Sequence, residues 1–247
     1  DLRIEHRKAL AAIRPFTVDD VSKLAVRGQY AAGEVDGEAV AAYRDEPKVD
    51  PQSTVETYAA LRLFVDNWRW RDVPFLLRTG KRMRRKLTQI VVTFKPTPHI
   101  MFRDVCDPRY PGVCRPPNRL VINVQPDEGI NLRFEGKVPG QDMRLSSAVM
   151  DFDFTEQFGA DGLDAYATLL LDAMRGDQAL FKDRHEIEAA WRVAQPVLEH
   201  WSRSGSDDLA FYPAGSWGPE EAQRLFTSYG EWRNPEGKSS RSRLIER

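Results

Sequence analysis

The chain has 247 residues, of which 41% are apolar and 30% charged, and its formal net charge is −1. Length and composition are ordinary for a globular protein of one large domain or two small ones. The near-neutral charge argues against a dedicated nucleic-acid-binding protein, and no apolar run approaches the about 18 residues of a membrane span. Because the sequence does not begin with methionine, we allow for a natural start further upstream and treat the chain as a candidate fragment.

The first part of the chain predicts one short helix followed by strands. Residues 4–13 have apolar side chains at helical spacing, whereas residues 28–43 contain three glycines and predict an irregular segment. The run ETYAALRLFVDNW fits either a strand or a helix. Five further short runs predict strands, and their short connections favour antiparallel pairing: VPFLL, QIVVTF, RLVINVQ, INLRFE and SAVMDFDF.

Residues 95–118 contain six of the sixteen prolines and predict a long loop, because proline cannot donate to a strand ladder. This loop holds both cysteines, Cys106 and Cys114. A single pair of cysteines is not the disulfide framework typical of a secreted protein, so we expect free thiols in a cytoplasmic protein. The alternative is a disulfide between the two cysteines, which would close a short loop.

The last third of the chain is predicted to be helical. Residues 163–175 form one amphipathic helix that ends at Gly176, and Asp183 with Glu186 caps a second helix, which Pro196 bends or ends early. We expect residues 1–235 to form one domain and residues 236–247 a mobile tail. Strands first and helices later indicate an α+β fold, with helices packed on a large, mostly antiparallel sheet.

The stretch RTGKRMRRKL carries the strongest chemical signal, with six cations in ten residues: Arg78, Lys81, Arg82, Arg84, Arg85 and Lys86. A phosphate group needs several charge-assisted donors, each contributing about 1.5–3 kcal/mol. A loop between two strands can aim Lys81 and Lys86 at one point, and Gly80 permits a turn there. The alternative is a solvated hairpin tip whose charges discourage edge pairing.

Other chemistry is not indicated. The four histidines (His6, His99, His185 and His200) have no metal-ligand spacing with one another or with the cysteines, so we expect no metal site. There is no G-x-S-x-G elbow, no P-loop and no G-x-G-x-x-G after a strand. The residues alone thus predict a binding surface for an anion, without a catalytic group.

Several longer strings carry a family resemblance: RGQYAAG, STVETYAALRLFVDNWRWRDVPFLLRTGKR, NRLVINVQPDEGINL, LDAYATLLLDAMRGDQALF, EAAWRVAQPVLEHW and FYPAGSWGP. In this order they resemble the C-terminal domain of bacterial glucose-6-phosphate dehydrogenases, from about Leu2 to about Trp217. Only the loop with the prolines and cysteines departs noticeably. Collinear motifs over most of a chain are more specific than any single motif.

The resemblance implies a function. The family oxidises D-glucose 6-phosphate to the lactone with NADP+, at the entry of the oxidative pentose phosphate pathway, and its C-terminal domain binds the sugar phosphate and forms the subunit interface. Lys81, Lys86 and Gln125 match the family's substrate-binding positions, with Arg82, Arg84 and Arg85 shaping the potential around them. We therefore expect glucose 6-phosphate as ligand and a homodimer that pairs through the sheet.

Departures from the family pattern limit these expectations. The glycine-rich coenzyme loop, the H-Y-L-G-K-E-like segment and the catalytic histidine are missing, so we expect no catalytic residue in this chain and NADP binding mainly elsewhere. Mammalian members also bind a structural NADP on this domain. Arg78 matches that site, but Leu87, Val91 and Asn123 occupy positions where cations are expected, so we expect no such site here.

Two alternatives to an enzyme part remain. The chain could act alone as a non-catalytic sugar-phosphate-binding or assembly module, which glucose 6-phosphate titration without turnover would identify. It could also bind nucleic acid through its arginines. In that case the affinity would fall steeply with salt concentration and would not change when sugar phosphates are added.

Overall fold

The structure is a computed structural model that describes residues 2–95, 117–141, 145–159, 165–226 and 230–235. The chain divides into two compact units, each described here by itself. The first unit comprises Asp1–Arg85 and Leu163–Glu231, and the second comprises Lys86–Gly162 and Trp232–Arg247. The predicted tail (residues 236–247) and most of the proline loop, with Cys106, Cys114 and His99, lie outside the described residues.

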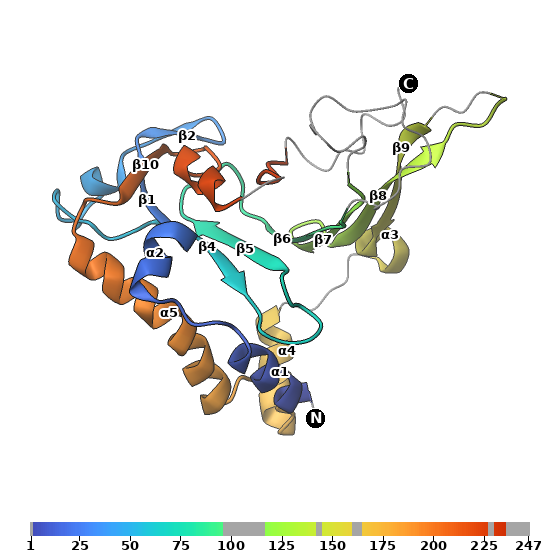
Figure 1. Cartoon of the computed structure of the whole chain (residues 1–247), viewed down its shortest axis with the longest axis horizontal. Coiled ribbons are helices and arrows are strands. Elements are labelled where there is room, and N and C mark those ends of the chain that lie inside the picture. The colour runs from blue at the N-terminus through green and yellow to red at the C-terminus, as the bar shows by residue number, and fades with distance from the viewer. Residues whose placement is uncertain (1, 96–116, 142–144, 160–164, 227–229, 236–247) are drawn as a thin grey trace. The chain divides into compact units, whose positions relative to one another are not determined.

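A four-stranded sheet in the order β10-β1-β4-β5 forms the centre of the first unit (Figure 1). Its strands are β1 (Ala25–Ala31), β4 (Tyr58–Phe64), β5 (Pro74–Gly80) and β10 (Leu209–Pro213). β10 runs parallel to β1, and the other two pairs are antiparallel. β1 is buried along almost its whole length, as expected for a central strand.

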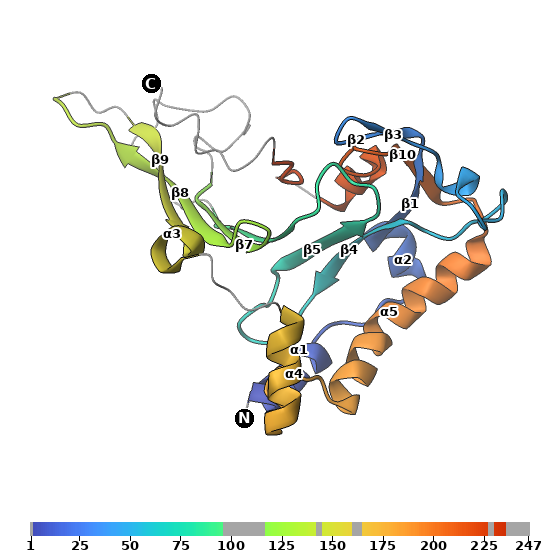
Figure 2. The same ribbon diagram turned by 180° about the vertical axis from the view of Figure 1, so that it is seen from behind.

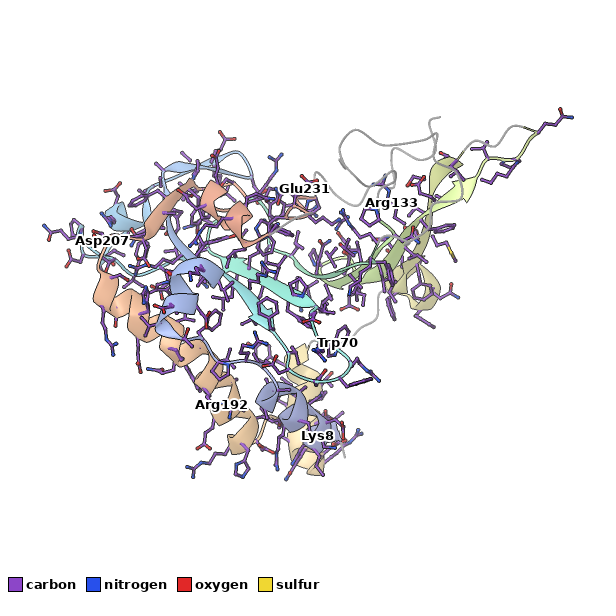
Figure 3. All side chains as sticks on the ribbon, in the orientation of Figure 1. Lys8, Trp70, Arg133, Arg192, Asp207 and Glu231 are labelled. Carbon is purple, nitrogen blue, oxygen red and sulfur yellow. The ribbon has the colours of Figure 1, made fainter. Side chains whose placement is uncertain are left out.

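Two helices cover one face of this sheet, α2 (Val18–Leu24) and α5 (Arg184–Ser204), as both views show (Figures 1 and 2). Val193, Val197 and Trp201 of α5 pack with Val21 of α2 in the core of the unit. Side chains at this spacing lie on one face of a helix, which explains why α5 is amphipathic. The guanidinium of Arg192 donates to the carbonyl of Ala11 at 3.3 Å and joins α5 to the end of α1 (Leu2–Ala11; Figure 3).

The remaining elements of the first unit are short or peripheral. β2 (Gly33–Val35) and β3 (Glu38–Val40) form a two-stranded hairpin, and η1 (Tyr43–Asp45) and η2 (Glu220–Leu225) are 3₁₀ turns. α4 (Ala165–Arg175) is the helix predicted over residues 163–175. Its predicted apolar face is exposed, with Tyr166 at 75%, Leu170 at 66% and Met174 at 79% of their full accessibility.

The second unit is an antiparallel sheet in the order β6-β7-β8-β9. Its strands are β6 (Thr88–Thr93), β7 (Arg119–Gln125), β8 (Gly129–Lys137) and β9 (Leu145–Asp153), and the short helix α3 (Phe154–Phe158) follows β9 directly (Figure 2). The register sets the two faces apart, because residues directly opposite each other share a face. One face carries rows of apolar side chains, and the other is mainly polar.

The α+β fold with mostly antiparallel strands is confirmed, and the strands are distributed over two four-stranded sheets and the β2–β3 hairpin. The five strand predictions are also confirmed, and the ambiguous run around Leu61 forms β4. The irregular segment predicted over residues 28–43 is wrong in part, because residues 28–31 belong to β1 and residues 33–40 form the hairpin. Helix α5 continues to Ser204, so Pro196 does not end it early.

Candidate functional site

The basic segment Lys81–Lys86 connects β5 to β6, two strands that lie in different sheets. β5 pairs with β4 in the first unit, and β6 pairs with β7 in the second. The interpretation of this segment as a solvated hairpin tip is therefore wrong, since the strands that flank it are not partners. The unit boundary falls between Arg85 and Lys86, at the end of the segment.

The main chain of Lys81 is held on both sides by groups of the first unit, the half-buried Thr57 and the buried Tyr212. Its N–H donates to the carbonyl of Thr57 at 2.8 Å, and its carbonyl accepts from the hydroxyl of Tyr212 at 2.8 Å. Tyr212 is fully buried, whereas the side chain of Lys81 is exposed. The strand end thus combines a fixed main chain with an exposed lysine side chain.

The connection after β10 fixes the next residues of the basic segment. The N–H of Gly215 donates to the carbonyl of Arg82 at 2.8 Å, and the N–H of Arg84 donates to the carbonyl of Ser216 at 2.9 Å. Gly215 has φ = +82°, and a Cβ at this position would lie 1.8 Å from the carbonyl oxygen of Glu34. Only glycine fits there, so the close approach of the two segments depends on it.

The sequence prediction that Gly80 permits a turn is wrong. A glycine is needed there because a larger side chain would collide with its neighbours. A Cβ on Gly80 would lie 2.9 Å from both the sulfur of Met83 and the ring of Tyr58. The left-handed conformation in this turn falls instead on Arg82, with φ = 49°. The segment is therefore tightly packed at Gly80 and turns at Arg82.

Two of the arginines are engaged with their own unit. Arg78 donates to the carbonyl of Trp217 at 3.3 Å and lies 5.3 Å from the centre of its ring, and burial lowers its pKa. Burial also raises the pKa of the neighbouring Tyr58 to about 12. Arg82 forms a long ion pair with Glu46 at 3.5 Å. Arg78 and Arg82 thus contribute to the fold, while the exposed Lys81 is available to a ligand.

The other two predicted substrate-binding residues lie in the second unit. Gln125 is the last residue of β7 and is exposed, and it stands opposite Thr88, the first residue of β6. Lys86 precedes Thr88 by two residues, so Lys86 and Gln125 come to the same end of the second sheet. The convergence of Lys81 with these two residues stays a prediction.

A row of amide groups crosses the polar face of the second sheet, and the sequence did not predict it. Gln89 donates to Asn123 at 2.6 Å and accepts from Arg233 at 2.8 Å, and Asn123 donates to Asn131 at 3.4 Å. Asn123 is thus engaged with its neighbours, and Leu87 and Val91 carry no charge. These positions supply no cation for the phosphates of a second NADP, and the absence of such a site stays a prediction.

Two kinds of site are not found where the structure describes the chain. Within the described residues, no group of three or more His, Cys, Asp or Glu side chains is arranged to hold a metal ion. No helix among them has the length and apolar character needed to cross a membrane.

The family model for the glucose-6-phosphate dehydrogenase C-terminal domain matches residues 1–233, so the chain belongs to that family. Glucose-6-phosphate 1-dehydrogenase of Aggregatibacter actinomycetemcomitans is 45% identical over 96% of this chain, and that of Mycolicibacterium smegmatis is 43% identical over 93%. The matches cover 46% and 45% of those two proteins. The chain therefore spans about half the length of these relatives.

Solved structures agree with this assignment. Glucose-6-phosphate 1-dehydrogenase from Mycobacterium avium superposes with a TM-score of 0.74 at 31% identity, covering 96% of this chain and 45% of that protein. A glucose-6-phosphate dehydrogenase in complex with its substrate glucose-6-phosphate gives a TM-score of 0.79 at 28% identity, covering 94% and 45%.

Proposed function

We propose that this chain is the sugar-phosphate-binding and subunit-pairing part of an NADP-dependent glucose-6-phosphate dehydrogenase. The whole enzyme would convert D-glucose 6-phosphate and NADP+ to 6-phosphoglucono-1,5-lactone and NADPH in the cytoplasm, at the entry of the oxidative pentose phosphate pathway. The family match over residues 1–233 is the observation that carries this proposal. The complex of a structural neighbour with glucose-6-phosphate supports the choice of substrate.

In this proposal Lys81 binds the 6-phosphate, and Lys86 and Gln125 complete the contacts. Lys81 suits the role because its main chain is fixed by Thr57 and Tyr212 while its side chain is exposed. A preorganised cation loses less conformational freedom on binding than one on a mobile loop. The bound sugar would thereby be positioned, and NADP, held by the part of the enzyme that this chain does not cover, would supply the hydride acceptor.

A chimeric enzyme tests this function. The 237 matched residues of the Aggregatibacter relative would be replaced by this chain, and NADPH formation would be followed with glucose 6-phosphate as substrate. The proposal predicts activity, and it predicts that Lys81→Ala raises KM about 10- to 100-fold, the worth of one charge-assisted hydrogen bond. A folded chimera without activity, or with an unchanged KM after Lys81→Ala, would contradict the proposal.

We also infer that a second copy of the chain pairs through the apolar face of the second sheet. Two rows of directly opposed residues form this face: Ile90, Ile122, Ile130 and Phe152 in one row, and Val92, Leu120, Leu132 and Met150 in the next. In the described structure Ile90 is 53% and Met150 62% exposed. Contiguous apolar surface of this kind on a sheet marks an interaction site, and pairing of two identical faces satisfies both copies.

A further inference from the structure

Tyr212 makes the contact on which this inference depends. It lies on β10, is fully buried, and is 131 residues away from Lys81 in sequence. Its hydroxyl is 2.8 Å from the carbonyl oxygen of Lys81, 3.2 Å from the carbonyl oxygen of Thr57 and 3.1 Å from the Thr57 hydroxyl. A buried hydroxyl is costly unless it is hydrogen-bonded, and this one bridges the start of β4 and the end of β5.

The single proton of the hydroxyl has a preferred acceptor. The carbonyl oxygen of Lys81 is the nearest of the three oxygens, and the Thr57 hydroxyl can donate to the phenolic oxygen in return. Burial raises the pKa of Tyr212, so the phenol stays protonated and continues to donate at neutral pH. The Tyr212 ring is itself held by Tyr58 and Tyr30, at centroid distances of 5.5 and 6.5 Å.

We propose that Tyr212 is a positioning residue for phosphate binding, acting through the main chain of Lys81. This inference rests on the proposed function, in which Lys81 contacts the 6-phosphate. The hydroxyl fixes the peptide unit that follows the Lys81 Cα, while the Thr57 carbonyl fixes the N–H that precedes it. With both sides fixed, the ammonium group samples fewer positions before the ligand arrives, which lowers the cost of binding.

A double-mutant cycle on the 247-residue chain tests the proposal, with affinity for glucose 6-phosphate measured by titration calorimetry. Tyr212→Phe keeps the ring and its packing but removes the hydroxyl, so affinity should fall about three- to tenfold, the range for one neutral hydrogen bond. In a Lys81→Ala background the same substitution should change affinity less than about twofold, because its effect passes through Lys81. Tyr43→Phe is the matched control, since Tyr43 packs on Tyr30 but makes none of the three hydroxyl contacts of Tyr212, and should bind normally.

The outcomes separate the inference from the function on which it rests. If the unsubstituted chain does not bind, or if Lys81→Ala leaves affinity unchanged, the proposed function fails and the inference fails with it. If Lys81→Ala weakens binding but Tyr212→Phe does not, or weakens it equally in both backgrounds, only the inference is overturned. Should Tyr212→Phe not fold at 25 °C, both backgrounds are titrated at a lower temperature at which the variant is folded, and unchanged affinity there would overturn the inference.

Discussion

Arg27 of β1 is 1% exposed, and its Nε donates to a carboxylate oxygen of Asp208 at 2.8 Å. The same guanidinium also donates to the carbonyl of Gly205, so it ties β1 to the turn between α5 and β10. The carboxylate of Asp208 is 37% exposed and keeps contact with water, whereas the guanidinium does not. Removing Asp208 therefore leaves a buried charge without contact to water, whereas removing Arg27 leaves a carboxylate that water still contacts.

Asp208→Ala should destabilise the first unit more than Arg27→Met. The first change leaves a buried cation without its carboxylate, at a cost of about 3 kcal/mol, near the low end for a broken buried pair. The second leaves a carboxylate that water can solvate. Urea denaturation of both variants measures the difference, with the exposed neighbour Asp207 changed to Ala as control (Figure 3). A larger loss for Arg27→Met would contradict this account.

Acid should weaken the α5 cap. The Arg7 guanidinium, which donates to Asp183 through Nε at 2.9 Å, and the N–H of Glu186 lower the pKa of Asp183 to about 2. Because this pKa lies below the value in the unfolded chain, the stabilisation is present above about pH 4 and is lost as the pH falls towards 2. Asp183→Asn should lower the melting temperature at pH 7 by about 2–4 °C and make it less sensitive to pH between 4 and 2. Equal acid sensitivity in both proteins would contradict the assignment.

High pH should destabilise the folded chain through ionisation of Tyr58. Its pKa is raised to about 12 by burial, so the folded state retains a proton that the unfolded state releases near pH 10. The free energy of unfolding should therefore fall by about 2–3 kcal/mol between pH 10 and 12 through this residue alone. In Tyr58→Phe the free energy of unfolding, measured by denaturation over the same pH range, should fall about 2–3 kcal/mol less than in the unsubstituted chain. An identical pH dependence would mean that Tyr58 does not titrate as described.

Pairing through the second sheet can be tested on two adjacent residues of β9. Met150 lies on the apolar face opposite Leu132, whereas Val149 lies on the polar face opposite Arg133. Met150→Lys should shift the chain from dimer to monomer in sedimentation velocity, because the charge would have to be buried between two copies. Val149→Lys, a comparable change at a residue 46% exposed, should leave the dimer intact. A dimer unaffected by Met150→Lys would rule out this face.

Much of the fold could be predicted because its signals are local. Alternating or continuous apolar runs identified the strands, and the Asp183–Glu186 box identified the start of α5. The error at residues 28–43 has a physical reason. Gly28 lies within β1, where a Cβ would come 3.2 Å from the carbonyl oxygen of Ala210, so this glycine serves close strand packing rather than a turn.

The site was harder to predict because its supports are far apart in sequence. Six neighbouring cations marked the loop, but nothing local indicated that Tyr212 and Gly215 would hold its main chain. The division of the chain at Arg85 also has no local signal, since the sequence runs through it without a linker. Family resemblance, rather than periodicity, selected Lys81, Lys86 and Gln125 from the many polar residues.

The central claim is that Lys81 binds the phosphate of the sugar, and titration calorimetry of the chain tests it most directly. We predict that glucose 6-phosphate binds while glucose does not, and that Lys81→Ala weakens binding about 10- to 100-fold. Lys8→Ala, which removes an exposed lysine paired with Glu5 on α1, should have no effect (Figure 3). Equal affinities for glucose 6-phosphate in the unsubstituted chain and in Lys81→Ala would contradict the claim.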